Sequence, residues 1–273
     1  EMCIRDSLTA YRIMTLPLHG WKVAVLRSLE QSHSLITRLE TYGAEVISIP
    51  TIRIVPPTDL TQLHHAASQL SAGTYEWVVF TSANAVRCIV DHMTGPLSPQ
   101  TRVATVGRAT ARVAQQYHLD PVLQPPVTKQ NALGLLEVFE SAASWPEDHR
   151  KILVPHANIA PSTLVDGLKA QGWVVDDIIG YRTIVADPPP PSIHGLLTTG
   201  QITAICITSG STIRNLVTIA GPPHPQTLLA CIGPSAAAAT KKLGLKVAVV
   251  PEVSEAEALA DALAAYAQQK LQP

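Results

Sequence analysis

Two stretches of the sequence, WVVFTSANAV at 77–86 and AICITSGSTI at 204–213, have nearly the same pattern. Each is an apolar run followed by a Thr-Ser pair and a small residue that opens a helix-like run. Short apolar runs bounded by turn signals are typical of buried strands, and Ser or Thr directly before a helical pattern is typical of a helix N-terminus. The repetition suggests that the chain contains one structural module twice.

The similarity continues on both sides of these stretches at a nearly constant spacing. Four pairs of residues mark it: Lys22 and Lys151 (129 positions apart), Thr81 and Thr208 (127), Gly107 and Gly233 (126), and Pro125 and Pro251 (126). A fixed period over most of a chain indicates an internal duplication. We therefore expect two copies of a module of about 126 residues.

Each copy opens with a strand–helix–strand pattern. In the first copy, KVAVL (22–26) predicts a strand, SHSLITRLETYG (32–43) a helix closed by a C′ glycine, and AEVISIP (44–50) a second strand. The same order returns at 151–155, 160–172 and 173–184. Alternating strands and helices predict the α/β class, with two doubly wound parallel-sheet domains that arose by duplication.

Proline-rich segments at 49–57 and 181–191 occupy equivalent places in the two copies. Proline stiffens a segment and cannot donate to a sheet, so both segments are expected to be extended linkers between the domains. The chain then starts in one domain, passes to the other and returns. Domain 1 is expected to hold residues 20–54 plus 182–273, and domain 2 residues 55–181.

Composition excludes several classes of protein. The chain has 273 residues, 46% of them apolar, a net charge of −1 and few aromatic residues, so nucleic acid is not an expected partner. No stretch of the sequence reaches the roughly 18 consecutive apolar residues that a membrane-spanning helix needs. Four cysteines without CxxC spacing favour a reducing cytoplasm and no zinc site. Residues 1–19 lack the pattern of a signal peptide and are expected to be a disordered or spurious extension, with Met14 as a plausible start.

Candidate site residues follow from where the repeated turns lie. Thr81 and Ser82, with Asn84 in the same turn, and Thr208 and Ser209 stand where strands end and helices begin, which is where open parallel sheets bind ligands. Hydroxyls and free N–H groups there suit an anion. The alternative is that these residues are ordinary helix caps.

Four further positions complete the set of candidates. In VGRATA (106–111), Thr110 is expected to cap a helix and present its hydroxyl outward. Tyr181 begins the second linker and is expected between the domains, and Arg27 follows the first strand. His156 is a candidate for metal binding or proton transfer. No Walker A sequence, GxGxxG, HExxH or catalytic triad occurs.

The ordered set of motifs resembles the uroporphyrinogen-III synthase family from about Trp21 to Leu271. The motifs are KVAVLR, GAEVISIPTIRI, VVFTSANAV, VGRATA, ILVPHA, GWVVDDIIGYRTI, ICITSGST and IGPSAAAA. The resemblance implies two α/β domains joined by a two-stranded linker, with the active site in the cleft between them. It also implies a cytoplasmic monomer that uses neither a metal nor an organic cofactor.

What the resemblance implies about chemistry is specific. The substrate is hydroxymethylbilane, a linear tetrapyrrole with eight carboxylates, which is closed to uroporphyrinogen III with loss of water and inversion of the last ring. The preceding enzyme, hydroxymethylbilane synthase, is a possible transient partner. Tyr181 matches the family's tyrosine that donates to the leaving hydroxyl, Thr110 matches a threonine of the first glycine turn, and Ser82 and Ser209 match serines that meet carboxylates.

The chain departs from the family pattern at two places. In the second glycine turn, GPSA, Ala236 stands at the position equivalent to Thr110, so the hydroxyl role either is dispensable or has moved to Ser235. PHA at 155–157 lacks the basic residue often found after that strand. Two other readings of the scaffold stay open: an intracellular ligand sensor without turnover, and a nucleotide-dependent enzyme, for which the glycine pattern is missing.

Overall fold

The structure is a computed structural model that describes residues 16–27, 29–141 and 151–271 and divides the chain into two units. Unit 1 joins the chain up to Arg53 to the chain from Val185 onward, and unit 2 runs from Ile54 to Ile184. The chain therefore crosses between the units twice, close to the positions at which the two linkers were expected.

Unit 1 is built on a five-stranded sheet in the order β11-β10-β9-β1-β2, with every neighbouring pair parallel. Its strands are β1 (Lys22–Val25), β2 (Glu45–Ser48), β9 (Ala204–Ile207), β10 (Leu228–Cys231) and β11 (Val247–Val249). All four residues of β9 are fully buried, as expected for a central strand covered on both faces.

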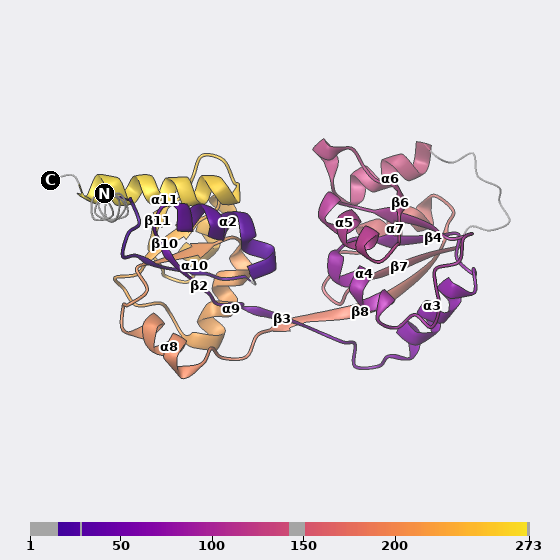
Figure 1. Cartoon of the computed structure of the whole chain (residues 1–273), viewed down its shortest axis with the longest axis horizontal. Coiled ribbons are helices and arrows are strands. Elements are labelled where there is room, and N and C mark those ends of the chain that lie inside the picture. Colours follow the sequence, from indigo (N-terminus) through magenta and orange to yellow (C-terminus); the bar gives the residue numbers. More distant parts are fainter. Residues whose placement is uncertain (1–15, 28, 142–150, 272–273) are drawn as a thin grey trace, which may run out of the picture. The chain divides into compact units, whose positions relative to one another are not determined.

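Helices cover both faces of this sheet (Figure 1). Val23, Val25 and Cys206 point to a core shared with α2 (Leu29–Thr41) and α11 (Ala256–Leu271). Ala24 and Ile205, one position along, point to the opposite core, which is formed with α8 (Pro191–Thr198), α9 (Gly210–Ala220) and α10 (Pro234–Lys242). The alternation of strand side chains thus places one apolar layer on each face.

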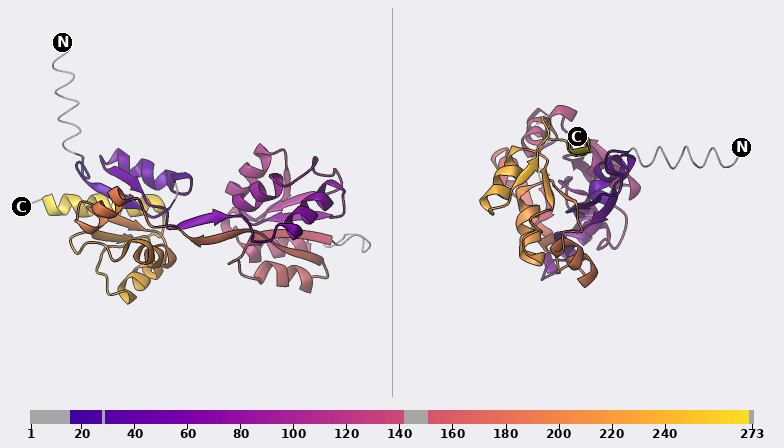
Figure 2. Two further views of the ribbon diagram at one scale, coloured as in Figure 1. Left: turned by 90° about the horizontal axis from the view of Figure 1, so that it is seen from below. Right: turned by 90° about the vertical axis from the view of Figure 1, so that its left-hand side faces the viewer.

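Unit 2 repeats this plan on a six-stranded sheet in the order β3-β8-β7-β4-β5-β6. Its strands are β3 (Ile52–Val55), β4 (Trp77–Phe80), β5 (Arg102–Thr105), β6 (Pro121–Leu123), β7 (Lys151–Ala157) and β8 (Val174–Val185). The pairs from β8 to β6 are parallel. Strand β3 lies beside β8 at the edge, and the two are seen side by side in Figure 2.

The helices of unit 2 also cover both faces of its sheet. One core lies under α3 (Thr61–Ser71), α4 (Ala83–Val90) and α5 (Arg108–Gln116), and the other lies under α6 (Ala132–Ser141) and α7 (Thr163–Ala170). A short 3-10 helix, η1 (Val127–Lys129), precedes α6. Phe139 packs edge-on against both Trp77 and Trp173 in the second core.

The two sheets have the same strand order once the repeat is applied, which confirms the predicted fold class. β1 and β2 of the first copy correspond to β7 and β8 of the second, and β4, β5 and β6 correspond to β9, β10 and β11. Each unit thus combines the opening strands of one copy with the body of the other. Backbone positions with positive φ recur at the same spacings: Gly43 and Gly172, Gly73 and Gly200, and His118 and Gly244.

The structure corrects the expected limit of the N-terminal extension. Leu18 is fully buried in the first core of unit 1, and its N–H donates to the carbonyl of Tyr42 at 2.9 Å. The folded unit therefore begins before residue 20. Residues 1–15, including Met14, lie outside the described residues.

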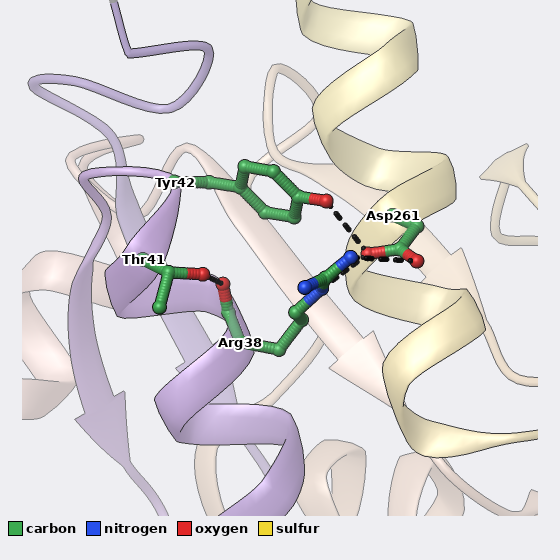
Figure 3. A network of polar contacts seen from close by, with 4 residues as sticks. All are labelled: Arg38, Thr41, Tyr42 and Asp261. Carbon is green, nitrogen blue, oxygen red and sulfur yellow. Dashed lines mark hydrogen bonds and ion pairs between the residues drawn. The ribbon is translucent and has the colours of Figure 1, made fainter.

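A polar contact joins α2 to α11 (Figure 3). Asp261 accepts from Arg38 Nε at 2.7 Å, from Arg38 Nη2 at 3.3 Å and from the Tyr42 hydroxyl at 2.8 Å. Within the described residues, no helix is both long and apolar enough to cross a membrane.

Candidate active site

The candidate residues of unit 2 gather where β4, β5 and β7 end. Because these strands are parallel, their carboxyl ends lie at one edge of the sheet, the usual place for ligands in open α/β sheets. Thr81 and Ser82 follow β4 directly, and His156 lies at the end of β7.

Ser82 is the N-cap of α4 and also contacts Tyr181. Its extended backbone (φ −152°, ψ 155°) lets Oγ accept from the Ala85 N–H at 3.1 Å. The same Oγ lies 2.9 Å from the hydroxyl of Tyr181. The capping interpretation is thus correct for Ser82, and this serine has a second polar partner that sequence analysis did not predict.

Tyr181 belongs to unit 2 and lies within β8, which continues to Val185. The expectation that it begins the linker is therefore wrong. Its side chain is 9% exposed and packs in the core beneath α4, and its hydroxyl reaches Ser82. β8 agrees to within one residue with the strand expected at 173–184, and β3 lies beside it, so Tyr181 is an interior residue of a paired strand.

Thr110 does not cap its helix. Gly107 occupies the N-cap position of α5 with extended backbone (φ −141°), and Thr110 is the third residue of the helix. It is 6% exposed, so its side chain is buried and does not point outward as expected. Asn84 lies in the first turn of α4, where its Oδ1 accepts from Arg87 Nη1 at 3.4 Å.

A pocket of about 370 Å³ opens at the same edge of unit 2. Its walls are mostly apolar and come from the ends of β4, β5 and β7 and from the first turns of α6 and α7. The lining residues are Thr81, Val106, Asn131, Ala132, Leu133, Val154, His156, Ala160, Pro161, Thr163, Leu164 and Val165. Leu133 of this lining is more than half exposed, so part of the apolar wall faces solvent.

The first turn of α7 brings backbone donors to this pocket. Thr163, Leu164 and Val165 are the first three residues of α7, and no side chain caps the helix at Ser162. The N–H groups of a first helical turn have no partner inside the helix and favour an anion. Asn131, in contrast, caps α6, because its Oδ1 accepts from the Gly134 N–H at 2.9 Å.

His156 lines the pocket with both ring nitrogens engaged. Nδ1 lies 2.8 Å from the carbonyl oxygen of Ala157, and Nε2 contacts a carboxylate oxygen of Asp177. The ring of His156 is thus fixed at the end of β7 by polar contacts at both of its nitrogens.

The corresponding edge of unit 1 carries the second set of candidates. Ser209 caps α9, where its Oγ accepts from the Thr212 N–H at 3.3 Å and lies 2.9 Å from Ser211 Oγ. Thr208 Oγ1 is buried and has no hydrogen-bond partner among the described residues. Ser235 is an exposed residue in the first turn of α10, and Arg27 follows β1.

Sequence analysis missed Asn131 and Thr163, and it singled out His156 without placing it in a pocket. A signal for Asn131 was present, because Asn directly before an apolar helical pattern is typical of an N-cap. No local signal marked Thr163 as a pocket residue, since α7 meets the ends of β4 and β5 only in the folded unit.

The fold and the sites together define a class of protein. It is an internally duplicated α/β protein in which the two copies exchange their opening strands, and hydroxyl-bearing turns lie at the carboxyl edge of each sheet. A family model described as uroporphyrinogen-III synthase HemD matches residues 33–261. The chain therefore belongs to the uroporphyrinogen-III synthase family. It is accordingly a cyclising lyase of tetrapyrrole biosynthesis.

Individual relatives agree with this family. The porphyrin biosynthesis protein HemD of Ruminiclostridium josui is 27% identical over 92% of this chain, which spans 49% of that protein. The chloroplastic uroporphyrinogen-III synthase of Oryza sativa subsp. japonica is 27% identical over 92% of this chain and 83% of its own length.

Two solved structures share the fold. Uroporphyrinogen-III synthetase of Helicobacter pylori 26695 superposes with a TM-score of 0.56 at 13% identity, over 88% of this chain and 97% of that one. A mutant uroporphyrinogen III synthase of Thermus thermophilus gives a TM-score of 0.51 at 16% identity, over 91% of this chain and 99% of that one.

Proposed function

We propose that the chain closes hydroxymethylbilane to uroporphyrinogen III, with loss of water and inversion of the last ring, and that Tyr181 assists the departure of the terminal hydroxyl. The family assignment supports the reaction. The contact between the Tyr181 hydroxyl and Ser82 Oγ supports the role of the tyrosine and is the observation on which this assignment rests.

The contact prepares Tyr181 to act as a donor. Either hydroxyl of this pair can donate to the other, and in the arrangement that we propose Ser82, whose Oγ accepts from the Ala85 N–H, donates to the Tyr181 oxygen. The phenolic hydrogen is then directed to the leaving hydroxyl of the substrate. Hydrogen bonds in such a chain polarise one another, which strengthens the donor at its end. No strong acid or base is required.

Holding one folded conformer of the substrate is the larger task. Hydroxymethylbilane is intrinsically reactive and closes unaided to the other isomer, so positioning decides which product forms. The pocket of unit 2 offers apolar walls to a pyrrole ring and the first-turn N–H groups of α7 to one of its carboxylates. Thr81 and Thr163 add hydroxyls beside them, and the His156 ring adds a polar group to the wall.

The hydroxyls of unit 1 are assigned to further carboxylates. Ser209 and Ser235 lie at helix N-termini, where backbone N–H groups supplement the hydroxyls. The buried Oγ1 of Thr208, which has no hydrogen-bond partner among the described residues, is assigned a donor role in the same turn. Arg27 supplies a positive charge after β1. Thr110 and Asn84 are assigned only to the support of the α5 and α4 turns.

We place the reaction in the cytoplasm. We also propose that hydroxymethylbilane synthase transfers the unstable substrate directly to this protein. The free thiols of Cys88, Cys206 and Cys231 fit a reducing compartment.

The test of the reaction is to generate hydroxymethylbilane in the presence of the protein, oxidise the products and separate the type I and type III uroporphyrins. A catalytic excess of type III is expected. Type I alone, from folded protein, would contradict the proposal and favour a polycarboxylate-binding protein without turnover.

The role of Tyr181 is tested by Tyr181→Phe, which keeps the buried ring and removes the hydroxyl. We expect kcat to fall at least about tenfold while stability changes by no more than about 1.5 kcal/mol, the usual contribution of one hydrogen bond. Tyr75→Phe is the matched control, because it removes a buried phenol that donates to Asp176 at 2.7 Å in the same unit, away from Ser82. Equal turnover in the two variants would exclude Tyr181 from the mechanism.

A further inference from the structure

The direction in which Tyr181 points is set by an irregularity in β8. Along the pairing of β7 with β8, consecutive residues match one to one up to His156 and Ile179. The next pair is Ala157 with Tyr181, so Gly180 has no partner on β7. One additional residue in a paired strand is a β-bulge, a feature that redirects side chains next to functional sites.

The bulge moves Tyr181 to the other face of the sheet. Side chains alternate along a regular strand, so Ile178 would share its face with residue 180, and Tyr181 would share the face of Val175. Val175 packs under α6 and α7, whereas Ile178 packs under α4. Because Gly180 is additional, Tyr181 returns to the face of Ile178 and joins the core that contains Val86 of α4. Only on that face does its hydroxyl meet Ser82.

Helix α4 holds the bulge as well as the tyrosine. The thiol of Cys88, on the same helix that Ser82 caps, donates to the carbonyl of Gly180. Burial raises the pKa of Cys88 to about 11, with Asp91 adding to the shift, so the thiol keeps its hydrogen at neutral pH. Gly180 is buried, and a Cβ there would make ordinary van der Waals contact with Pro155 Cβ at 3.4 Å.

The strand beyond the bulge is fixed by Asn158. Its backbone N–H donates to the Tyr181 carbonyl at 3.1 Å, and its side-chain Oδ1 accepts from the Thr183 N–H at 2.8 Å. Tyr181 is therefore held from both directions along β8. Cys88 fixes the residue before it, and Asn158 fixes Tyr181 itself and the residue two positions later.

We propose that the bulge at Gly180, held by Cys88 and Asn158, positions Tyr181 against Ser82, and that Cys88 and Asn158 are positioning residues for the reaction. This inference rests on the proposed function. Neither residue contacts the Tyr181 hydroxyl, so both act through the backbone of β8.

Loss of the Cys88 donor leaves the buried carbonyl of Gly180 without its partner. The bulge then relaxes, and the contact between Tyr181 and Ser82 is populated less often. Substrate binding does not depend on this contact, so kcat falls and KM does not change. Serine at position 88 keeps a donor, although its shorter bond to Cβ gives it less reach.

The first experiment is a double-mutant cycle on the full chain, with type III product as the readout. Cys88→Ala is expected to lower kcat about fivefold when Tyr181 is present and to have no effect in the Tyr181→Phe background, because the two changes act on one step. Cys88→Ser should restore part of the loss. Ile89→Val, a buried neighbour on α4 that makes no polar contact with β8, is the packing control and should leave kcat unchanged.

Two results would overturn the proposal. The first is an unchanged kcat in folded Cys88→Ala. The second is an equal loss in both backgrounds, which would show that Cys88 supports the fold and does not act through Tyr181.

Asn158 provides a variant that does not endanger folding, because its side chain is exposed. Asn158→Ala removes the acceptor for Thr183, whereas Asn158→Asp keeps an oxygen at that position. We expect Asn158→Ala to lower kcat without raising KM and Asn158→Asp to retain the wild-type value. Equal kcat values for the two variants would contradict the role of Asn158.

A measurement without turnover separates this inference from the proposed function. The chain has six tyrosines, so 3-fluorotyrosine labelling gives a small set of ¹⁹F resonances, and Tyr181→Phe identifies one of them. Cys88→Ala should shift or broaden that resonance, and Cys88→Ser should move it back. This result would stand even if the wild-type protein formed no type III product. An unchanged Tyr181 resonance in Cys88→Ala would overturn the positioning role whatever the activity.

Discussion

Thr105 carries a hydroxyl that the fold buries without a partner among the described residues. It ends β5 and is fully buried. The equivalent residue of unit 1 is Cys231, whose Sγ lies 3.4 Å from Thr240 Oγ1, and that hydroxyl donates to the Ala236 carbonyl. In unit 2 the helix residue equivalent to Thr240 is Ala114. In unit 2 the hydroxyl is therefore carried by the strand and not by the helix, and no helix carbonyl among the described residues accepts its hydrogen.

Thr105→Val should stabilise the protein. Valine has the same shape and removes the desolvated hydroxyl, so we expect the free energy of unfolding to rise by about 1 kcal/mol in denaturant titrations. Thr101→Val is the matched control, because the buried hydroxyl of Thr101 donates to the Tyr75 carbonyl at 2.7 Å. It should lower stability by about 1 kcal/mol. Destabilisation of similar size by both changes would show that Thr105 has a partner in solution.

Individual side chains differed in how far the sequence predicted them. Ser82 and Ser209 were expected as possible caps, and both cap their helices, because Ser directly after a strand and before a helical run leaves little choice of position. Thr110 was misplaced because a helix start can shift by a few residues, and Gly107 took the N-cap. The contact of Ser82 with Tyr181 joins residues 99 positions apart, which no local pattern records.

A residue that is strained for its type lies two positions after the end of helix α5. His118 has φ of 58°, in the left-handed region that costs non-glycine residues about 1 kcal/mol or more, whereas the equivalent position after α10 is Gly244 with φ of 75°. His118→Gly should therefore raise stability, by about 0.5 kcal/mol after allowing for the larger entropy of the unfolded glycine chain. Gly244→Ala, which meets no neighbour within 4 Å, should lower stability through backbone strain alone. Thermal unfolding of both variants checks the pair, and a stabilising Gly244→Ala would contradict the argument.

The contact between α2 and α11 predicts a dependence on pH. The hydrogen bond from Arg38, helped by Tyr42, lowers the pKa of Asp261 below its ordinary value (Figure 3). A carboxyl with a lowered folded-state pKa adds stability above its unfolded pKa of about 3.9, and this contribution is lost as the pH falls through the folded value.

Asp261→Asn removes this ion pair and should consequently lower Tm at pH 7. The decrease should be only about 2 °C, because both side chains of the pair are about half exposed and exposed ion pairs contribute little. The difference from wild type should shrink as the pH falls below 4, because protonation of the wild-type carboxyl then removes the same contribution. Melting curves recorded from pH 7 down to the lowest pH at which both proteins still fold test this. A difference that stays constant over this range would assign the loss to packing.

The elements themselves were largely predictable, but the bulge was not. Strand β8 was expected from an apolar run with the right length, and its partner β7 from the repeat. A bulge depends on which carbonyls and N–H groups of the neighbouring strand are used, and the repeat offers no second example, because β2 pairs with β1 without a break. The face to which Tyr181 points could therefore be found only in the structure.

Duplication explains why the topology of the whole chain could be predicted from sequence spacing. Two copies that exchange their opening strands must build two sheets of the same order, and they do. The exception is β3, an edge strand of the six-stranded sheet that spans the boundary between the units and has no equivalent among the described strands of the five-stranded sheet. Its partner β8 extends to Val185, so paired strands occupy what the prolines alone suggested was an extended linker.

Each unit has helices on both faces of its own sheet and its own pair of apolar cores, so each should fold without the other. Residues 54–184 form a continuous segment that can be expressed directly. In unit 1, the Ala186 N–H donates to the Thr51 carbonyl at 3.1 Å, so the two ends left by removal of unit 2 are adjacent, and a short Gly-Ser linker should join them. We expect a cooperative thermal transition and dispersed amide resonances from each fragment. A fragment without either property would show that its unit depends on the other for folding.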